Sequence, residues 1–131
     1  VNAEDFFVGP LLTSRNNNEV IKSVIIPKAK EKTGYAFKEI SEKHGDFALA
    51  SFAAIASHNH VRFVVGGVSD EITAIDWLTE DLNEIEDLIN DFVWDLNTST
   101  DQYTSERYKR DIVRDLGFKT IKTAMNRKNT S

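Results

Sequence analysis

Residues 34–52, GYAFKEISEKHGDFALASF, decide the fold of this chain. Two extended segments, residues 34–41 and 46–57, flank the polar turn EKHG at residues 42–45. Gly45 permits a bend with positive φ in that turn. The stretch therefore predicts a hairpin of two antiparallel strands.

The second segment of this hairpin has two interpretations. Its alanines favour a helix, yet the run is also short enough for a buried strand. Alternate residues of a strand point to opposite faces. One face would carry Phe47, Leu49, Ser51, Ala53 and Ile55, and the other Ala48, Ala50, Phe52, Ala54 and Ala56. Small side chains let a bulky or flat group approach the backbone, which would be either a packed helix or a cofactor ring.

The rest of the chain changes from strand patterns to helical periodicity. Residues 20–26, VIKSVII, are β-branched and end at Pro27, and residues 61–68 are rich in valine. Both read as strands. Apolar spacing of three and four residues predicts a short helix over 71–80, an amphipathic helix over 82–96 and a last helix over 105–126. We expect an α+β fold in which an antiparallel sheet of three to four strands (20–26, 34–41, 46–57, 61–68) carries the helices on one face, with residues 1–131 as a single domain.

Composition narrows the functional classes. The 131 residues are 40% hydrophobic and 28% charged, with a formal net charge of −5 and no cysteine. The acidic balance argues against nucleic acid or an anionic membrane as partner, and the lack of cysteine excludes disulfides and thiolate-held metals or clusters within the chain. The acidic start VNAED does not resemble a signal peptide, so we expect a cytoplasmic location. The first residue is Val rather than Met, which suggests a fragment.

Candidate chemical groups are few. His58 and His60, with His44, invite a metal hypothesis, but they lack a carboxylate or thiolate at ligand spacing and read better as solvated turn histidines. The acidic run 80–87 reads as the solvated face of a helix, and Gly66-Gly67 as the turn that ends a strand. No motif for a catalytic nucleophile occurs. Lys38, in the middle of a strand, has an ordinary solvent-facing role as its simplest interpretation.

Five segments together resemble a known family. They are AEDFFVGPLLTS, EVIKSVIIP, YAFKEISEKHGDFALASFAAIA, FVVGGVS and SERYKRDIVRDL, in this order along the chain. The chain resembles the C-terminal domain of the FAD-binding (medium) subunit of the xanthine dehydrogenase, carbon monoxide dehydrogenase and aldehyde oxidoreductase family of molybdo-flavoenzymes.

The resemblance implies a role in electron transfer rather than catalytic residues in this chain. FAD would be shared with an N-terminal FAD-binding domain that is absent here, and this domain would cover one side of the flavin. Partners would be an iron–sulfur small subunit and a molybdenum large subunit, and the isolated domain would be inactive. By position, the resemblance implies cofactor-binding roles for Lys38, Asp46 and Phe47. A lysine near the ring would stabilise negative charge on reduced flavin, and Phe47 would lie beside the isoalloxazine.

The chain also departs from the family. Glu42, Lys43 and His44 stand where two basic residues often precede Gly-Asp, which leaves contacts with partner subunits open. The alternative function is a stand-alone interaction or dimerisation module, forming a homodimer, with the same fold and no catalytic role.

Overall fold

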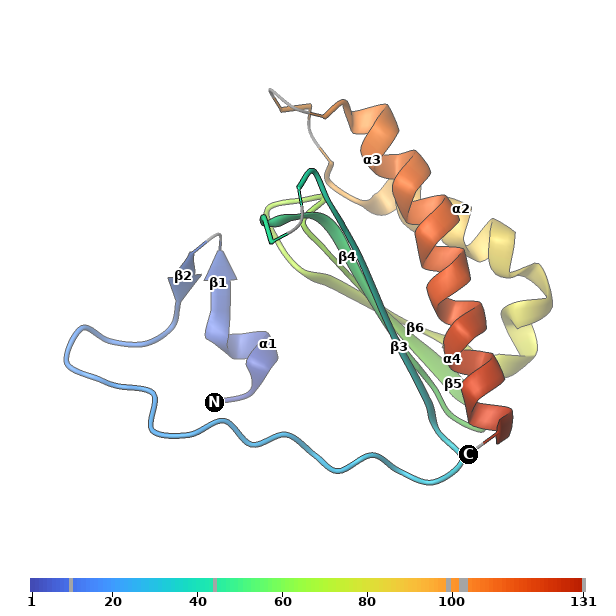
Figure 1. Cartoon of the computed structure of the whole chain (residues 1–131), viewed down its shortest axis with the longest axis horizontal. Helices are drawn as coiled ribbons and strands as arrows, with labels where there is room; N and C mark the ends of the chain where they lie inside the picture. Colours follow the sequence, from blue (N-terminus) through green and yellow to red (C-terminus); the bar gives the residue numbers. More distant parts are fainter. Residues whose placement is uncertain (10, 44, 99, 102–103, 131) are drawn as a thin grey trace.

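The computed structural model describes residues 1–9, 11–43, 45–98, 100–101 and 104–130, with the backbone alone at Leu82. Its centre is an antiparallel sheet with strand order β3-β4-β5-β6. These strands are β3 (Gly34–Ser41), β4 (Ala48–Ala56), β5 (His60–Gly66) and β6 (Thr73–Leu78). The predicted hairpin 34–57 is confirmed, and so is the α+β class (Figure 1).

The helices lie together on one side of this sheet (Figure 1). They are the 3₁₀ turn η1 (Thr79–Glu84), α2 (Ile85–Asp95), α3 (Glu106–Ile112), the π-helical segment η2 (Val113–Gly117) and α4 (Phe118–Thr130). The last three adjoin without a break, which confirms the predicted last helix. Ser105 caps its start by accepting a hydrogen bond from the backbone N–H of Tyr108 at 3.2 Å.

The helix-covered face of the sheet holds the core. Ala50, Phe52, Ala54 and Ala56 are at most 1% exposed, and α4 packs across β3 and β4. Contact is so close that a Cβ on Gly34 would lie 1.8 Å from the carbonyl oxygen of Ala124. A packed helix, rather than a cofactor ring, therefore covers the alanines.

An aromatic cluster fills the centre of the core. The ring of Phe63 lies 6.2 Å from Phe52, 6.0 Å from Trp77 and 5.9 Å from Phe92, measured between centroids. These rings come from three strands and from α2. Their contacts tie the sheet to the helical layer, because aromatic pairs at such distances add to the free energy of burial.

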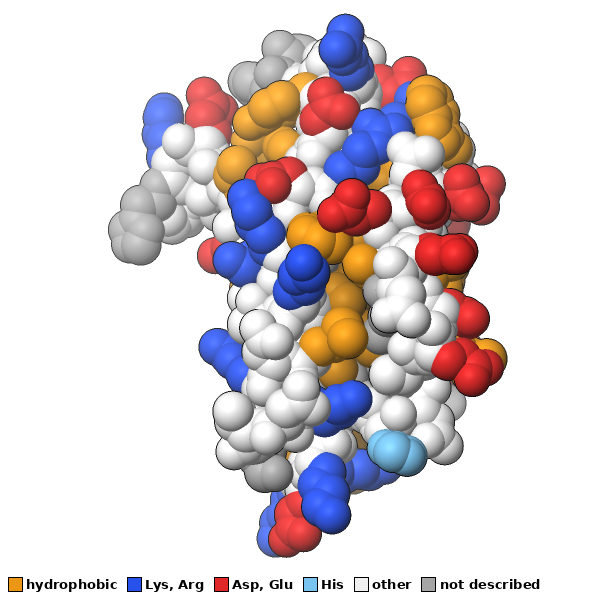
Figure 2. Space-filling view, turned by 90° about the vertical axis from the view of Figure 1, so that its right-hand side faces the viewer, with side chains coloured by type: hydrophobic (Ala, Val, Ile, Leu, Met, Phe, Trp, Pro, Cys, Tyr) orange, Lys and Arg blue, Asp and Glu red, His pale blue; other side chains and the backbone are white. Residues whose placement is uncertain are grey.

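The outer surface of the helices is charged. Acidic side chains gather along one margin of the helix-covered side (Figure 2). The acidic residues of the run 80–87 are exposed, which confirms their prediction as a solvated helix face. Across the described residues, no helix is both long and apolar enough to cross a membrane.

The predicted helix over 71–80 is wrong. Most of this segment is β6, the edge strand that pairs with β5 through Phe63 and Ile75 and through Val61 and Trp77. The spacing of Ile72, Ile75 and Leu78 resembles a helical period. The segment is nevertheless a strand, in which alternate side chains, those of Ile75 and Trp77, point toward the core.

The predicted strand over 20–26 is also absent. This segment is extended but pairs with no strand, and its five apolar residues are 59–90% exposed. Strand propensity was present, but a strand also needs a neighbour for its backbone N–H and C=O groups. None lies beside it in the described part of the chain.

We call residues 1–33 the arm and residues 34–130 the body. The arm begins with α1 (Ala3–Phe6) and a small hairpin of β1 (Phe7–Gly9) and β2 (Leu12–Thr13), and then runs extended to β3. It lies on the side of the sheet opposite the helices (Figure 1). An ion pair between Glu4 and Arg62 and a hydrogen bond from the Lys30 backbone to the Tyr35 hydroxyl connect the two parts.

Candidate functional site

The β3–β4 turn is built by its own backbone. The Asp46 N–H donates to the Lys43 carbonyl at 3.1 Å, and the Ser41 hydroxyl donates to the same oxygen at 2.9 Å. Gly45 has a φ of +84°, with nothing within 4 Å of the position where a Cβ would lie. These bonds tie Ser41 and Asp46 to the Lys43 carbonyl, and the space beside Gly45 is open. His44 lies outside the described residues.

Two of the three residues predicted to bind a cofactor lie together at this turn. The Asp46 carboxylate accepts a hydrogen bond from the Phe47 N–H at 2.8 Å. The ring of Phe47 is 86% exposed. The apolar ring of Phe47 is therefore left in water, where its burial against a flat apolar group would be favourable.

Lys38, the third predicted residue, lies elsewhere on the hairpin. Lys38 pairs with Phe52, which is fully buried. Because paired residues share a face of the sheet, the Lys38 side chain points to the helix-covered face. Lys38 is half-buried. Phe47 is five residues from Phe52 along β4, which places it roughly 15 Å from Lys38 along the strand direction. The structure therefore brings Asp46 and Phe47 together but sets Lys38 apart.

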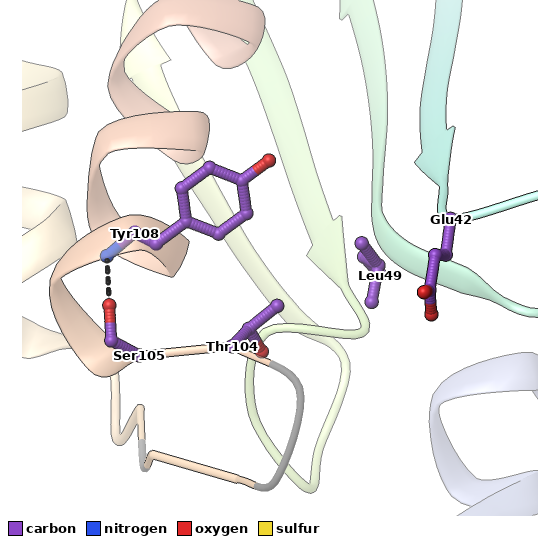
Figure 3. A pocket seen from close by; sticks show the side chains of 5 residues that line it. All are labelled: Glu42, Leu49, Thr104, Ser105 and Tyr108. Atoms are coloured by element: carbon purple, nitrogen blue, oxygen red, sulfur yellow. Dashed lines mark hydrogen bonds between the residues drawn. The ribbon is translucent and has the colours of Figure 1, made fainter.

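A cleft of about 450 Å³ opens beside the turn. Its lining residues come from the hairpin and from the segment that enters α3 (Figure 3): Glu42, Leu49, Thr104, Ser105 and Tyr108. The Tyr108 ring stands on the α3 side, across the cleft from Leu49 and Glu42 (Figure 3). An aromatic wall, an aliphatic wall and one carboxylate thus face the same space.

The α3 side of the cleft is fastened by charge and hydrogen bonds. The Thr104 hydroxyl lies 3.1 Å from both carboxylate oxygens of Asp101, and the Lys109 ammonium lies 2.8 Å from that carboxylate. Ser105 is occupied as the helix cap. Thr104 and Ser105 of the cleft wall thus have their hydroxyl groups engaged in fixing the start of α3.

Sequence reasoning did not find Tyr108 as a site residue. Its place in the helical period predicts only a position on the last helix, whereas the side chain is half-exposed and lines the cleft. The available signal was its position in the first turn after a capping serine, where a tyrosine can present its ring beyond the helix end.

His58 and His60 lie at the end of the β4–β5 hairpin. The Ser57 N–H donates to the His60 carbonyl at 2.9 Å, and the Ser57 hydroxyl lies 2.9 Å from Nδ1 of His60. Within the described ranges, no group of three histidine, aspartate or glutamate side chains could hold a metal ion.

Comparison with known proteins identifies relatives along nearly the whole chain. The glyceraldehyde dehydrogenase medium chain of Sulfolobus acidocaldarius is 30% identical, over 93% of this chain and 47% of its own length. The nicotine 6-hydroxylase medium subunit of Paenarthrobacter nicotinovorans is 34% identical, over 57% of this chain and 28% of its own length. No protein-family model matches the chain.

Solved structures share the fold. Carbon monoxide dehydrogenase of Hydrogenophaga pseudoflava superposes with a TM-score of 0.75 at 20% identity, covering 94% of this chain and 47% of that one. The enzyme of Oligotropha carboxidovorans gives a TM-score of 0.73 at 17% identity, covering 97% and 49%. The chain thus spans at most about half the length of the relatives that it matches. The resemblance in the sequence is confirmed: the chain is similar to the medium subunits of several dehydrogenases and hydroxylases, and it shares its fold with carbon monoxide dehydrogenase.

Proposed function

We propose that this chain is the C-terminal half of the FAD-carrying medium subunit of a molybdenum hydroxylase or dehydrogenase, and that its β3–β4 turn covers one side of the flavin. The observation that carries the proposal is the similarity to medium subunits together with Phe47, an exposed aromatic ring two residues before Leu49, which lines the cleft. An aromatic ring in such a position offers a flat apolar surface to an isoalloxazine.

The residues present fit one part of an FAD site. Phe47 and the cleft walls Leu49 and Tyr108 suit a planar ring system. The turn at Gly67 does not suit a pyrophosphate, because the carbonyl oxygens of Leu49 and Ala48 face it, 3.0 and 3.1 Å from the position where a Cβ would lie, and would repel an anion. The phosphates would therefore be held by the preceding FAD-binding domain. FAD, when bound, supplies the electron transfer, and this chain supplies packing and charge around the ring.

In this proposal the three predicted residues act differently. Phe47 contacts the ring, and Asp46 holds the Phe47 backbone through the 2.8 Å hydrogen bond. Lys38 acts through its positive charge from farther along the hairpin, since a cation stabilises a reduced, negatively charged flavin without touching it. The iron–sulfur and molybdenum cofactors would belong to the partner subunits, and the chain would serve the oxidoreductase without catalytic residues of its own.

Substitution of Phe47 tests the proposed contact. The subunit is assembled from this chain and the FAD-binding half, and FAD affinity is measured by fluorescence titration. We expect Phe47→Ala to weaken FAD binding about tenfold, the loss of one aromatic stacking contact. Phe37→Ala is the matched control, because Phe37 is also exposed but lies on the open face of β3 away from the turn. A folded, assembled subunit that binds no FAD, or equal effects of the two variants, would contradict the proposal.

Substitution of Lys38 tests the electrostatic part. Lys38→Met removes the charge while keeping most of the side-chain volume, and should make the flavin reduction potential more negative. Lys43→Met, in the exposed turn, controls for the net charge. Potentials would be measured by dye-coupled reductive titration. A large fall in melting temperature with an unchanged potential would assign Lys38 a structural role instead.

A stand-alone interaction module is the second candidate, and the exposed apolar arm is the observation that favours it. Such an arm could pair two copies of the chain. Analytical ultracentrifugation separates the two functions: a tight homodimer with no affinity for an FAD-binding half would support the module and exclude the flavoprotein role.

A further inference from the structure

The arm contains a strand-like segment without a partner. Residues 20–26 include five β-branched apolar side chains, all exposed: Val20, Ile21, Val24, Ile25 and Ile26. Within the part of the chain that the structure describes, the backbone of residues 20–29 makes no hydrogen bond. Both the apolar side chains and the backbone groups of this segment are therefore left to water, a costly state for a run of this composition.

The pattern of the segment indicates the kind of surface that it fits. As a strand, Val20, Lys22, Val24 and Ile26 would share one face, and Ile21, Ser23 and Ile25 the other. Apolar residues occupy most positions of both faces. A strand with two apolar faces is typical of the interior of a sheet that is covered on both sides, whereas an edge or solvent-facing strand alternates with polar residues.

The sheet of the body does not supply this place. Only β3 lies near the end of the arm, and the outer edge of β3 is partly occupied, because the Arg127 guanidinium donates to the Tyr35 carbonyl at 2.7 Å. Pairing there would also make residues 20–26 an edge strand rather than an interior one. The partner must therefore offer a sheet of its own.

The relatives indicate where that sheet lies. The alignments cover 93% and 94% of this chain, which exceeds the roughly three quarters that the body makes up, so they extend into the arm. The same relatives are about twice as long as this chain. We infer that residues 20–26 form an interior β-strand in a sheet contributed by the FAD-binding half of the medium subunit. The inference rests on the proposed function and deepens it: the arm belongs structurally to that half, and the body begins at Gly34.

Proline substitutions test the interior position. Val24→Pro and Ile25→Pro remove the N–H groups of adjacent residues, which point to opposite sides of a strand. In an interior strand both groups are bonded, so each variant should weaken association with the FAD-binding half about 100-fold. Ala29→Pro is the matched control, because Ala29 is exposed, extended and unbonded but lies beyond the proposed strand. We expect this control to bind within about threefold of the parent chain.

Association is measured by isothermal titration calorimetry with the separately produced FAD-binding half, and amide hydrogen exchange is recorded on the same complex. We expect the amides of residues 21–26 to exchange freely in the chain alone and at least about 100-fold more slowly in the complex. Circular dichroism of each variant alone should show an unchanged melting temperature of the body, since the arm packs little against it.

The outcomes separate this inference from the proposed function. If only one proline variant is disruptive, the segment is an edge strand and the inference is wrong. Free exchange in an intact complex, or failure of the two halves to associate, would also overturn it. A complex that protects residues 21–26 but binds no FAD would leave the strand assignment standing and contradict the proposed function instead.

Discussion

Residues 20–26 of the arm and strand β5 of the body differ little in composition and entirely in environment. Each carries one lysine or arginine among mostly β-branched or aromatic side chains. In β5, Val61, Phe63 and Val65 are fully buried, and hydrogen-bonded neighbours β4 and β6 flank the strand on both sides. The arm segment is exposed, and no strand of the described residues pairs with it.

Strand propensity thus indicates that a segment can join a sheet, not that a neighbouring strand is present. β5 obtains its partners within 20 residues on either side, through two short connections. The arm segment has only the β1–β2 hairpin before it and a charged loop after it. Its apolar residues are therefore better explained by a surface outside this chain than by a core inside it.

The most damaging change in the body should be Gly34→Val, at the start of β3. A Cβ here would lie 1.8 Å from the Ala124 carbonyl oxygen and 2.5 Å from the Lys128 nitrogen, both backbone atoms. We expect a loss of about 4 kcal/mol or more in the free energy of unfolding, measured by urea denaturation.

Gly45→Ala provides the control for that glycine. Gly45 has positive φ but open space around it. The strain of the left-handed backbone alone should therefore lower the free energy of unfolding by about 1 kcal/mol. A Gly34→Val chain as stable as Gly45→Ala would show that α4 does not pack on β3 as described.

The same substitution in the two segments compares them directly. Val65→Ala should cost about 2 kcal/mol, because Val65 is fully buried and its truncation leaves a cavity. Val24→Ala should leave the stability of the isolated chain within about 0.5 kcal/mol, because Val24 is 78% exposed. Thermal unfolding of both variants checks this. Similar losses of stability in the two variants would mean that the arm segment is packed in solution, and would contradict its description as exposed.

Loss of the helix cap should have a smaller effect. Ser105→Ala removes the acceptor for the Tyr108 N–H and should cost about 1 kcal/mol. Ser105→Asp keeps an acceptor and serves as the control. The midpoint of urea denaturation measures the loss. If Ser105→Asp lost as much stability as Ser105→Ala, the cause would be another feature of the cleft wall and not the cap hydrogen bond.

The smallest effect concerns the turn at residues 15–19 in the arm. Hydrogen bonds from Asn16 to the Glu19 carboxylate, first from its backbone N–H at 2.8 Å, lower the pKa of Glu19. A lowered folded-state pKa means that the turn is stabilised above the ordinary pKa of glutamate and loses that contribution as the pH falls through the lowered value. In an NMR pH titration, the chemical shift of the Asn16 amide should change as Glu19 is protonated. The melting temperature of the body should not change with this protonation. If protonation of Glu19 disrupted the turn and lowered the melting temperature of the body together, the arm would not be independent of the body in stability.

The sequence predicted most of the body. The hairpin of β3 and β4 followed from Gly45 between two extended segments, β5 from its valines, and the last two helices from their apolar periods. β6 was missed because three apolar residues at helical spacing concealed the alternation of Ile75 and Trp77. The arm was misjudged because no local pattern reveals whether a strand has a partner.

The candidate site was predictable only where it is local. Asp46 and Phe47 are neighbours in the chain, and their turn follows from Gly45. Tyr108 lies across the cleft from Leu49, about 60 residues away in the chain, through the packing of the last helix, and no local signal predicts that contact. Lys38 was predicted near the flavin, as Phe47 was, but the register directs its side chain to the helix side of the hairpin. Its role toward a flavin stays a prediction.

The hydrogen bond between Arg127 and the Tyr35 carbonyl has a consequence for aggregation. An unpaired edge such as that of β3 can recruit strands from other molecules, and a guanidinium on its carbonyl interferes with such pairing. The arm segment has only Lys22 as a charged residue within its apolar run. Self-association of chains that lack their partner should therefore start at the arm, and a charge such as Val24→Lys should suppress it without disturbing the body.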